Sequence, residues 1–399
     1  MMKSPALRFP HFLESWESHK LGDLASITMG QSPNSDSYND VGQGLPLIQG
    51  NADLKNGWTQ PSRFTTEAPK TCEAKDIILS VRAPVGELAR ASEPCCIGRG
   101  VCAIRPHASL PTNSDFIYYL LTAKKKEWAK LEQGSTFTAV SGNDISTLQL
   151  HAPSIQEQEL IAFFFSLLDK KISLTENKLT QLQSAKESLL FKIFSTQCST
   201  FKLRPSESNK LTTIVEVSGG HTPSMADKSL WEPGKNIWLT SKDVKSEYLS
   251  DSEMKISDKG LKNLRQYPAN SMVLVARSGI LKHSLPLALV RTPFTVNQDL
   301  KVLQVKEGNP EFIFFALKAK TRKILQNFVK SGTTVQSLMM PELMQMELEI
   351  PDKDTQDRIA NFFILFDKKI ETQQKKLTEP LHGRGSTTNL IRSPNPNNP

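Results

Sequence analysis

The side chains that could do chemistry in this sequence are polar and basic residues that recur at matching loop positions in its two halves. Arg, Lys, Asn, Gln, Ser and Thr side chains can form hydrogen bonds with base edges in a DNA groove. Candidates in the first half are Gln31, Ser32, Asn34, Gln49, Asn51, Arg82, Arg99, Ser135 and Thr136. Candidates in the second half are His221, Thr222, Ser224, Ser241, Lys242, Arg277, Ser278, Asn297, Gln298, Thr333 and Thr334. Any one of these residues is more often a solvated loop residue than a contact, so it is their recurrence in both halves that favours DNA reading.

Motifs for catalysis by the chain itself are missing. No G-x-x-x-x-G-K-[ST] phosphate loop occurs, which argues against a nucleotide-driven motor. An Asp/Asn-Pro-Pro-aromatic tetrapeptide and a glycine-rich cofactor loop are absent too, so adenine methylation has no visible active site. The 5 cysteines include no C-x-x-C pair, and the 7 histidines are not at metal-ligand spacing. We therefore expect no catalytic residue, no metal site and reduced thiols.

Composition sets broad limits on the class of protein. The net charge of +8 suits a polyanionic partner such as double-stranded DNA. Hydrophobic residues at 38% and charged residues at 23% are typical of a globular protein. No apolar run approaches the roughly 20 residues that span a bilayer, and the first residues lack a secretory signal. We expect a cytoplasmic protein without a membrane partner.

The chain contains a long internal repeat, which decides the fold class. "KLGDLASITMGQSP" from Lys20 aligns with "KLTTIVEVSGGHTP" from Lys210, and at the same offset "LIQGNAD" from Leu47 aligns with "IWLTSKD" from Ile237. Further matches are "DIILSVR" with "SMVLVAR", "DFIYYLL" with "EFIFFAL", and "HAPSIQEQ" with "EIPDKDTQ". The offset grows along the chain because loops tolerate added residues.

Each repeat predicts an α+β domain followed by a long helix. Short apolar runs separated by Gly, Pro, Asn and Asp predict strands, and a helix is expected at Asp115–Leu131 and at Glu311–Lys330. A Gly-Ser/Thr-Thr loop, a last strand and a proline turn lead into the long helix. The expected domains are 1–150 and 200–350, with spacer helices at 151–199 and 351–378 and a disordered tail at 379–399.

The two long helices share "IAFFFSLLDKKI" and "IANFFILFDKKI", which are identical at nine of twelve positions. Apolar residues alternate by four and three, which is the period of a coiled-coil seam. The first seam is Ile161, Phe165, Leu168, Ile172, Thr175, Leu179, Leu182, Lys186, Leu189 and Ile193. The second is Ile359, Phe363, Phe366, Ile370, Gln373 and Leu377, and Pro380 is expected to end that helix. We predict that the helices pair as an antiparallel coiled coil and give the chain an internal twofold.

A pseudo-symmetric reader on such a frame would recognise two half-sites at a spacing that the frame sets. Because the repeats differ outside their shared skeleton, the target is expected to be bipartite and asymmetric. Phosphate contacts are expected from Lys124, Lys125, Lys126, Lys318 and Arg322.

These residues together resemble the specificity subunit of type I restriction-modification enzymes. The resemblance covers roughly residues 7–377 and is carried by "LRFPHFLESWESHKLGDLASITMGQSP", "PSIQEQELIAFFFSLLDKKI" and "IPDKDTQDRIANFFILFDKKI". It implies two target recognition domains, with a subunit frame formed by Phe165, Leu168, Asp169, Ile172, Phe363, Phe366, Asp367 and Ile370.

The resemblance also implies partners and cofactors. Two methyltransferase subunits and restriction/translocase subunits would assemble on the chain, and S-adenosylmethionine, ATP and Mg would be bound by those partners. The second helix departs from the family pattern, because "KKLTEPLHGRGSTTNLIRSPNPNNP" has no apolar stripe. Two alternatives stay open: a coiled-coil adaptor that binds only proteins, and a self-sufficient DNA methyltransferase with divergent motifs.

Overall fold

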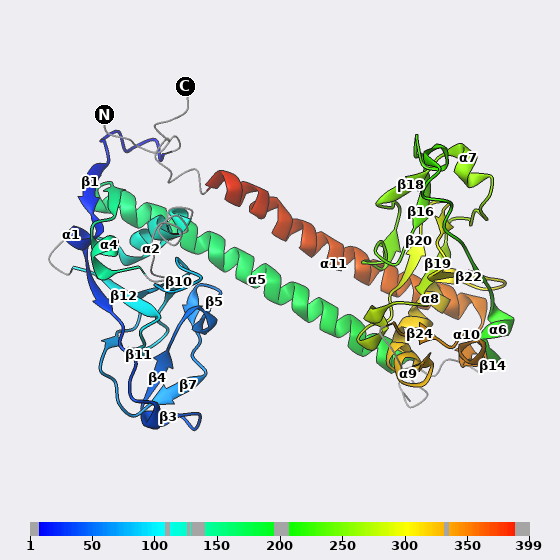
Figure 1. The fold of residues 1–399 in the computed structure, drawn as a ribbon, viewed down its shortest axis with the longest axis horizontal. Helices are drawn as coiled ribbons and strands as arrows, with labels where there is room; N and C mark the ends of the chain where they lie inside the picture. The colour runs from blue at the N-terminus through cyan, green and yellow to red at the C-terminus, as the bar shows by residue number, and fades with distance from the viewer. Residues whose placement is uncertain are drawn as a thin grey trace. The chain divides into compact units, whose positions relative to one another are not determined.

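A computed structural model describes residues 8–107, 112–125, 128, 140–194, 207–330 and 335–387, the last nine of these as backbone only. The chain divides into two compact units (Figure 1): unit 1 is Met1–Glu176 with Lys376–Pro399, and unit 2 is Asn177–Lys375. Both divisions fall inside long helices, α5 (Ile155–Phe194) and α11 (Lys353–Thr387). Each long helix is therefore continuous with both units.

Unit 1 is built on two main β-sheets. One has the strand order β2 (Ala25–Met29), β12 (Val101–Pro106), β9 (Ile77–Ser80), β10 (Leu88–Arg90), β6 (Trp58–Thr59) and β5 (Leu54–Lys55). The other has the order β3 (Tyr38–Asn39), β7 (Arg63–Thr65), β4 (Leu45–Ile48), β11 (Cys95–Ile97) and β8 (Thr71–Cys72), while β1 (Glu17–Lys20) pairs with β13 (Gln149–Ala152). The short helices are α1 (Leu21–Leu24), η1 (Ser35–Ser37), η2 (Asn51–Asp53), α2 (Ser114–Ala123) and α4 (Gly142–Ser146).

Unit 2 repeats this plan. Its larger sheet has the order β15 (Val215–Gly219), β22 (Leu300–Val305), β19 (Ser271–Val275), β20 (Leu287–Val290) and β17 (Tyr248–Leu249). The smaller sheets are β18 (Met254–Ile256), β16 (Asn236–Leu239) and β21 (Thr295–Val296), then β14 (Glu207–Lys210) with β25 (Glu347–Ile350), and β23 (Val329–Lys330) with β24 (Ser337–Leu338). The helices are α6 (Leu211–Ile214), η3 (Lys228–Leu230), α7 (Asp258–Leu261), η4 (Gly279–Lys282), α8 (Pro310–Ala319), α9 (Thr321–Asn327) and α10 (Met340–Leu343).

The central helix of each unit packs against the larger sheet because nearly all of its side chains are apolar. α2 begins at Asn113 and α8 at Asn309, and each asparagine side chain accepts a hydrogen bond from the backbone N–H three residues later. Phe116 and Phe312 are fully buried at these helix starts. The start of α5 completes the core of unit 1, whereas the end of α5 and the start of α11 complete that of unit 2.

The predicted α+β repeat is confirmed, with one correction of register. β1 pairs with β13 as β14 pairs with β25, and β2 pairs with β12 as β15 pairs with β22. The parallel ladders, however, place Ile48 beside Ile97 and Leu239 beside Val296. Ile48 therefore corresponds to Leu239, one residue later than the predicted alignment of Leu47 with Ile237, because the preceding loop of unit 2 is one residue longer.

The predicted helix at Glu311–Lys330 is wrong in its second half. α8 ends at Ala319, α9 is a separate short helix, and Val329 and Lys330 form β23. Lys320 lies between α8 and α9, and its ammonium donates to the Phe194 carbonyl of α5 at 2.9 Å. The helix predicted at Asp115–Leu131 is confirmed as α2 up to Ala123, but α2 ends there because Lys124 is a turn residue; residues 126–127 and 129–131 lie outside the described ranges.

Both long helices show the predicted seam. Every predicted seam position is buried or partly buried, including the polar positions Thr175, Lys186 and Gln373. Within unit 2, the Phe194 and Phe363 rings stack and Lys186 pairs with Asp367, so the end of α5 and the start of α11 run antiparallel. The expected helix end at Pro380 is wrong, since α11 continues to Thr387. A proline removes one backbone hydrogen bond and bends a helix but does not have to end it.

Candidate nucleic-acid interface

The predicted reading residues of unit 1 leave its sheets at one edge. β2 and β9 both run antiparallel to β12, so their C-terminal ends lie beside the start of β12. The loops after β2 and β9 carry Ser32 and Arg82, and the turn before β12 carries Arg99. β4 lies parallel to β11 and is followed by Gln49. Strand topology thus brings together residues that are far apart in the sequence.

A hollow of about 540 Å³ opens at this edge. Its lining residues are Ser32, Pro33, Ser35, Tyr38, Gln49, Arg82, Arg99 and Gly100. Four of them belong to the predicted DNA-reading set. Arg82 and Arg99 are exposed, and neither forms an ion pair with another residue in the described part of the chain. Two unpaired guanidinium groups beside a carboxamide can bind phosphates or the acceptor edge of guanine and adenine.

The polar lining of the hollow is held in place before any ligand binds. The Gln49 carboxamide donates to the Tyr38 hydroxyl at 3.3 Å, and that hydroxyl donates to the Pro33 carbonyl at 3.4 Å. The backbone N–H of Gln49 donates to the Asp53 carboxylate at 2.8 Å, and that of Arg99 donates to the Ser32 hydroxyl at 3.4 Å. These bonds restrain the Gln49 and Tyr38 side chains and the backbone beside Arg99, which reduces the entropy lost when a ligand is bound.

Among the described residues, the other candidates of unit 1 do not line the hollow. Gln31 and Asn51 are exposed in neighbouring loops. The Asn34 side chain accepts from the backbone N–H of Asp36 at 3.5 Å and caps η1. Ser135 and Thr136 lie outside the described residues.

Unit 2 gathers its predicted residues at the corresponding edge. β15 and β19 both run antiparallel to β22, and β16 lies parallel to β21, so the loops after these strands start together. The exposed or partly buried side chains in these loops are His221, Thr222, Ser224, Ser241, Lys242, Arg277, Ser278 and Gln298. The Thr222 hydroxyl donates to the Gln298 carboxamide at 2.7 Å, which links the first loop to the turn before β22. Thr333 and Thr334 lie outside the described residues.

Asn297 has a structural role. It is 7% exposed, its carboxamide binds the backbone N–H and the carboxylate of Asp299, and its own N–H donates to the Leu239 carbonyl at 3.0 Å. Gly98 makes the same backbone bond to Ile48 in unit 1. Asn297 therefore shapes the turn before β22, and its side chain is not available to a DNA groove.

Two of the lysines expected to bind phosphate are engaged within the protein. Lys125 pairs with Glu87 at 2.6 Å, and Lys318 pairs with Glu247 at 3.3 Å. Arg322 is exposed, and Lys126 lies outside the described residues. A basic residue on a helix face is an ambiguous signal in sequence because an acidic partner can come from a distant strand.

The loop that follows β2 in unit 1 and β15 in unit 2, here called the reading loop, begins with a glycine in both units, Gly30 and Gly220. The structure shows why. A Cβ at Gly30 would lie 2.1 Å from the Gly98 carbonyl oxygen, and one at Gly220 would lie 1.8 Å from that of Val296. Any side chain at these positions would push the loop away from the neighbouring strand end. The glycine that aligns in the repeat is thus required for the loops to meet.

The subunit frame is attached to each unit by equivalent contacts. The Gln158 side chain of α5 accepts from the backbone N–H of Asn113 at 3.0 Å, and Gln356 of α11 accepts from Asn309 at the same distance. Both glutamines also donate to the carbonyl of the proline before their helix. The long helices are therefore locked to the start of α2 and α8 at a defined angle.

The predicted frame aspartates are also attached to their units. Tyr119 donates to the Asp169 carboxylate at 2.9 Å, and Tyr248 donates to that of Asp367 at 2.7 Å. Burial and the neighbouring carboxylate raise the pKa of both tyrosines above the ordinary value. The predicted frame residues Phe165, Leu168, Ile172, Phe366 and Ile370 are partly buried, and Phe363 is fully buried.

Sequence reasoning missed two buried ion-pair clusters that involve the long helices. Lys186, which breaks the apolar seam, lies between Glu247 and Asp367 at 2.5 Å from each carboxylate. Burial opposes ionisation of Glu247, but Lys318 and Lys186 hold its pKa below the ordinary value; burial raises that of Asp367. In unit 1 the Arg8 guanidinium binds both carboxylate oxygens of Glu157. A lysine at a seam position was the one available sign of such a cluster.

A repeated apolar pair stays exposed on the long helices. Phe164 and Phe362 occupy the same position of the duplicated segment and are 40% and 43% exposed. Leu167 and Leu365 likewise correspond and are 49% and 65% exposed. Exposed large apolar residues that recur at equivalent positions indicate an interaction surface on each unit.

The described residues contain neither a candidate metal site nor a candidate membrane span. In the described ranges, no group of three or more His, Cys, Asp or Glu side chains is arranged to hold a metal ion. None of the described helices is long and apolar enough to cross a membrane.

The sequence of this chain is similar to those of known proteins. A family profile described as the type I restriction modification DNA specificity domain matches residues 13–184 and 204–379. A protein of Methanocaldococcus jannaschii assigned as the MjaX type I restriction enzyme specificity subunit is 34% identical over 179 residues, 44% of this chain and 42% of that protein. A type I restriction enzyme specificity subunit of Escherichia coli is 27% identical over 271 residues, 67% of this chain and 65% of the relative. The alignments thus span less than two thirds of these relatives.

Solved structures share the fold over the whole chain. The type I restriction-modification S subunit from M. genitalium matches with a TM-score of 0.65 and 15% identity, covering 98% of this chain and all of that one. A chain from a structure of a type I restriction-modification system, solved to explain complex assembly and conformational transition, matches with a TM-score of 0.59 and 13% identity, covering 97% and 98%.

Proposed function

Because the chain belongs to the type I restriction-modification DNA specificity family, we propose that it reads a bipartite, asymmetric DNA target, with one half-site recognised by each unit. The observation that carries this proposal is the hollow of unit 1, where Gln49, Arg82 and Arg99 converge from three separate loops. Their donors suit guanine, adenine and phosphate acceptors.

The units differ where they would read bases. Arg82 and Arg277 both follow the equivalent strands β9 and β19. Arg99, however, corresponds to Gln298, and Gln49 corresponds to Thr240, since each follows the same strand end. A shared arginine with different neighbours supports two half-sites of different sequence.

The repeated apolar pair supports a partner that binds twice. Phe164 with Leu167, and Phe362 with Leu365, present one motif on each unit. Two copies of the same subunit can use two such surfaces. We take this partner to be the methyltransferase subunit, which would flip and methylate an adenine using S-adenosylmethionine.

The chain itself would supply no catalysis. Restriction/translocase subunits, with ATP and Mg, would join the complex on the DNA in the cytoplasm. The two long helices would pair as an antiparallel coiled coil and set the length of the unread spacer. The contact between α5 and α11 in unit 2 supports this pairing at one end.

Methylome mapping of cells that express the chain with its methyltransferase partner tests the proposal. The expected result is a bipartite motif with a fixed gap. Exchanging residues 20–150 for the equivalent segment of another family member should change one half of the motif only. Arg82→Ala should weaken selection in that same half, whereas Arg277→Ala should weaken the other. Methylation by the purified chain alone would instead identify a self-sufficient methyltransferase, and DNA selection that no loop substitution alters would identify a protein-binding adaptor.

A further inference from the structure

The reading loop of unit 2, residues 220–224, is held at four of its five residues. Gly220 lies against the Val296 carbonyl, and the Thr222 hydroxyl donates to Gln298 at 2.7 Å. Two carbonyls of the loop accept hydrogen bonds from indole N–H groups. Trp231 Nε1 donates to Ser224 O at 3.0 Å, and Trp238 Nε1 donates to His221 O at 3.5 Å. The backbone from 220 to 224 is therefore fixed on both sides, while the His221 and Ser224 side chains stay exposed.

The two tryptophans form a small apolar cluster of their own. Their rings meet edge to face with centroids 4.9 Å apart, and they pack with Ile256. A rigid pair of rings is a fixed support for two donors because its geometry cannot relax without losing the packing. The indole N–H groups have their acceptors in the loop, so the loop and the cluster hold each other.

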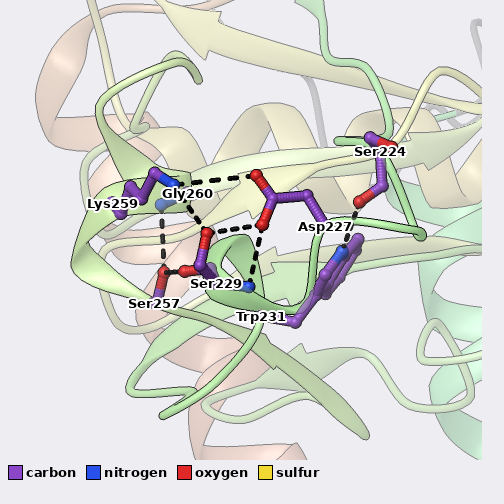
Figure 2. Close-up of polar contacts among 7 residues, drawn as sticks. All are labelled: Ser224, Asp227, Ser229, Trp231, Ser257, Lys259 and Gly260. Carbon is purple, nitrogen blue, oxygen red and sulfur yellow. Dashed lines mark hydrogen bonds and ion pairs between the residues drawn. The ribbon is translucent and has the colours of Figure 1, made fainter.

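A polar network behind Trp231 fixes its position (Figure 2). Asp227 accepts from the backbone N–H of Ser229 at 3.0 Å and from its hydroxyl at 2.5 Å, which caps η3. Lys259 donates to the same hydroxyl at 2.6 Å, and Ser257 donates to the Ser229 carbonyl at 2.7 Å. In Figure 2, Lys259 and Ser257 lie on one side of Ser229, and the Trp231–Ser224 bond lies on the other.

We propose that Trp231 and Trp238 are positioning residues that set the conformation of loop 220–224 and thereby the base preference of the second half-site. The inference rests on the proposed DNA-reading function. The indoles do not themselves face DNA, because they are buried and their donors are occupied. Selectivity in this half-site would then depend on a hydrogen bond behind the loop as well as on side chains in front of it.

The test is Trp231→Phe in the full chain, assembled with its methyltransferase partner and read out by methylome mapping. Phenylalanine keeps most of the ring packing but has no N–H donor. Loss of one positioning bond should reduce discrimination against single-base changes in the unit 2 half-site by about fivefold and leave the other half-site unchanged. Ser229→Ala, an exposed change that acts on the same loop through η3, should give a smaller loss in the same half.

Two matched variants serve as controls. Trp16→Phe removes a buried indole N–H that has no hydrogen-bond partner among the described residues, so neither half-site should change. Tyr38→Phe removes the hydroxyl that links Pro33 to Gln49 and should relax only the unit 1 half-site.

Unchanged selectivity in both Trp231→Phe and Ser229→Ala would overturn the inference. Equal relaxation of both half-sites would do so too, because it would indicate a general loss of stability. If the wild-type chain gave no bipartite motif, the proposed function would fail first, and this outcome is distinct from either result with the variants.

Discussion

The buried lysine of the long-helix seam offers the sharpest test of how unit 2 is held together. Lys186 has a side chain that is 9% exposed and is shared between Glu247 and Asp367, whose side chains are 33% and 15% exposed. Lys186→Met keeps an unbranched apolar stem of similar length, with sulfur in place of Cδ, and removes the ammonium. We expect the variant to fold and to be less stable at neutral pH.

The expected loss of stability depends on which partners the Glu247 and Asp367 carboxylates retain in the variant. Glu247 is one third exposed and retains Lys318 at 3.3 Å, so its loss is small. Asp367 retains only the Tyr248 hydroxyl among these partners. Removing one member of a buried ion pair costs about 3–5 kcal/mol, and because Asp367 is partly exposed we expect a loss of about 3 kcal/mol. A urea slope of about 3 kcal/mol/M converts this to a fall in midpoint of about 1 M.

The pH dependence of the lost stability tests whether the uncompensated Asp367 carboxylate is its cause. The raised pKa of Asp367 means that its contribution to stability is complete below the ordinary value of 3.8 and is lost as pH rises through the folded-state value. Without Lys186 the carboxyl is protonated more easily, so the cost of Lys186→Met should be largest near pH 7.5 and smaller near pH 5. Glu247 acts in the opposite direction, since its lowered pKa adds stability that is lost as pH falls below 4.5.

Urea unfolding of the full chain at the two pH values measures the effect, with hydrogen exchange to locate it. Exchange should accelerate in β19 and β22 of unit 2 and stay unchanged in β9 and β12 of unit 1, which serve as the internal control. Lys186→Met with Asp367→Asn should recover about half of the lost stability, because no uncompensated charge remains beside Tyr248. A loss below about 0.5 kcal/mol, or a loss that grows towards pH 5, would refute the reasoning.

Three further variants probe the frame and the loops. Gln356→Ala leaves the partly buried Asn309 N–H without its acceptor and should cost about 2 kcal/mol in urea unfolding, whereas Gln374→Ala on the exposed face should cost under about 0.5 kcal/mol. Gly220→Ala should cost about 2 kcal/mol or more and weaken binding to the full target, because its Cβ cannot fit 1.8 Å from a carbonyl oxygen; a stability equal to wild type would contradict that geometry. Leu365→Ser should reduce the number of methyltransferase subunits bound per chain, as measured by native mass spectrometry, and leave the unfolding midpoint within about 0.5 kcal/mol of wild type.

Features that depend on periodicity and on repeated strands could be predicted from the sequence. The seam positions follow from alternating steps of three and four residues, and the structure shields every one of them. The correspondence of β2 with β15, and of β9 with β19, follows from the aligned repeat. These features depend on local periodicity or occur in both halves of the chain, so the sequence carries a repeated signal for each of them.

Features that depend on contacts between distant segments could not be predicted. Asn297 and Gln298 are neighbours in one polar turn, yet the first is buried and the second exposed, because backbone bonds to β16 decide which way each side chain points. Lys318 is basic on a helix face, but Glu247 arrives from before β17 and neutralises it. The hollow of unit 1 likewise forms from three loops whose approach depends on Gly30.

The attachment of the long helices shows how far the two units have diverged while keeping one design. In unit 1 the hydroxyl that binds the helix aspartate comes from Tyr119 on α2, and the corresponding position in unit 2 is Phe315. Unit 2 supplies its hydroxyl from Tyr248 on β17, which corresponds to Trp58 of unit 1.

The arginine that accompanies each tyrosine has moved as well. Arg90 pairs with Asp115 at 2.6 Å and lies 5.0 Å from the Tyr119 ring, whereas Arg291 pairs with Glu311 at 2.7 Å and lies 4.8 Å from the Tyr248 ring. The strand ladders place Arg291 two residues beyond the counterpart of Arg90, on the same face. An alignment of the two units by position would suggest that the tyrosine and the arginine had each been lost from one unit. The conserved quantity is the arrangement of carboxylate, guanidinium, phenol and helix aspartate, which fixes each recognition unit to its long helix and leaves the reading loops free to vary.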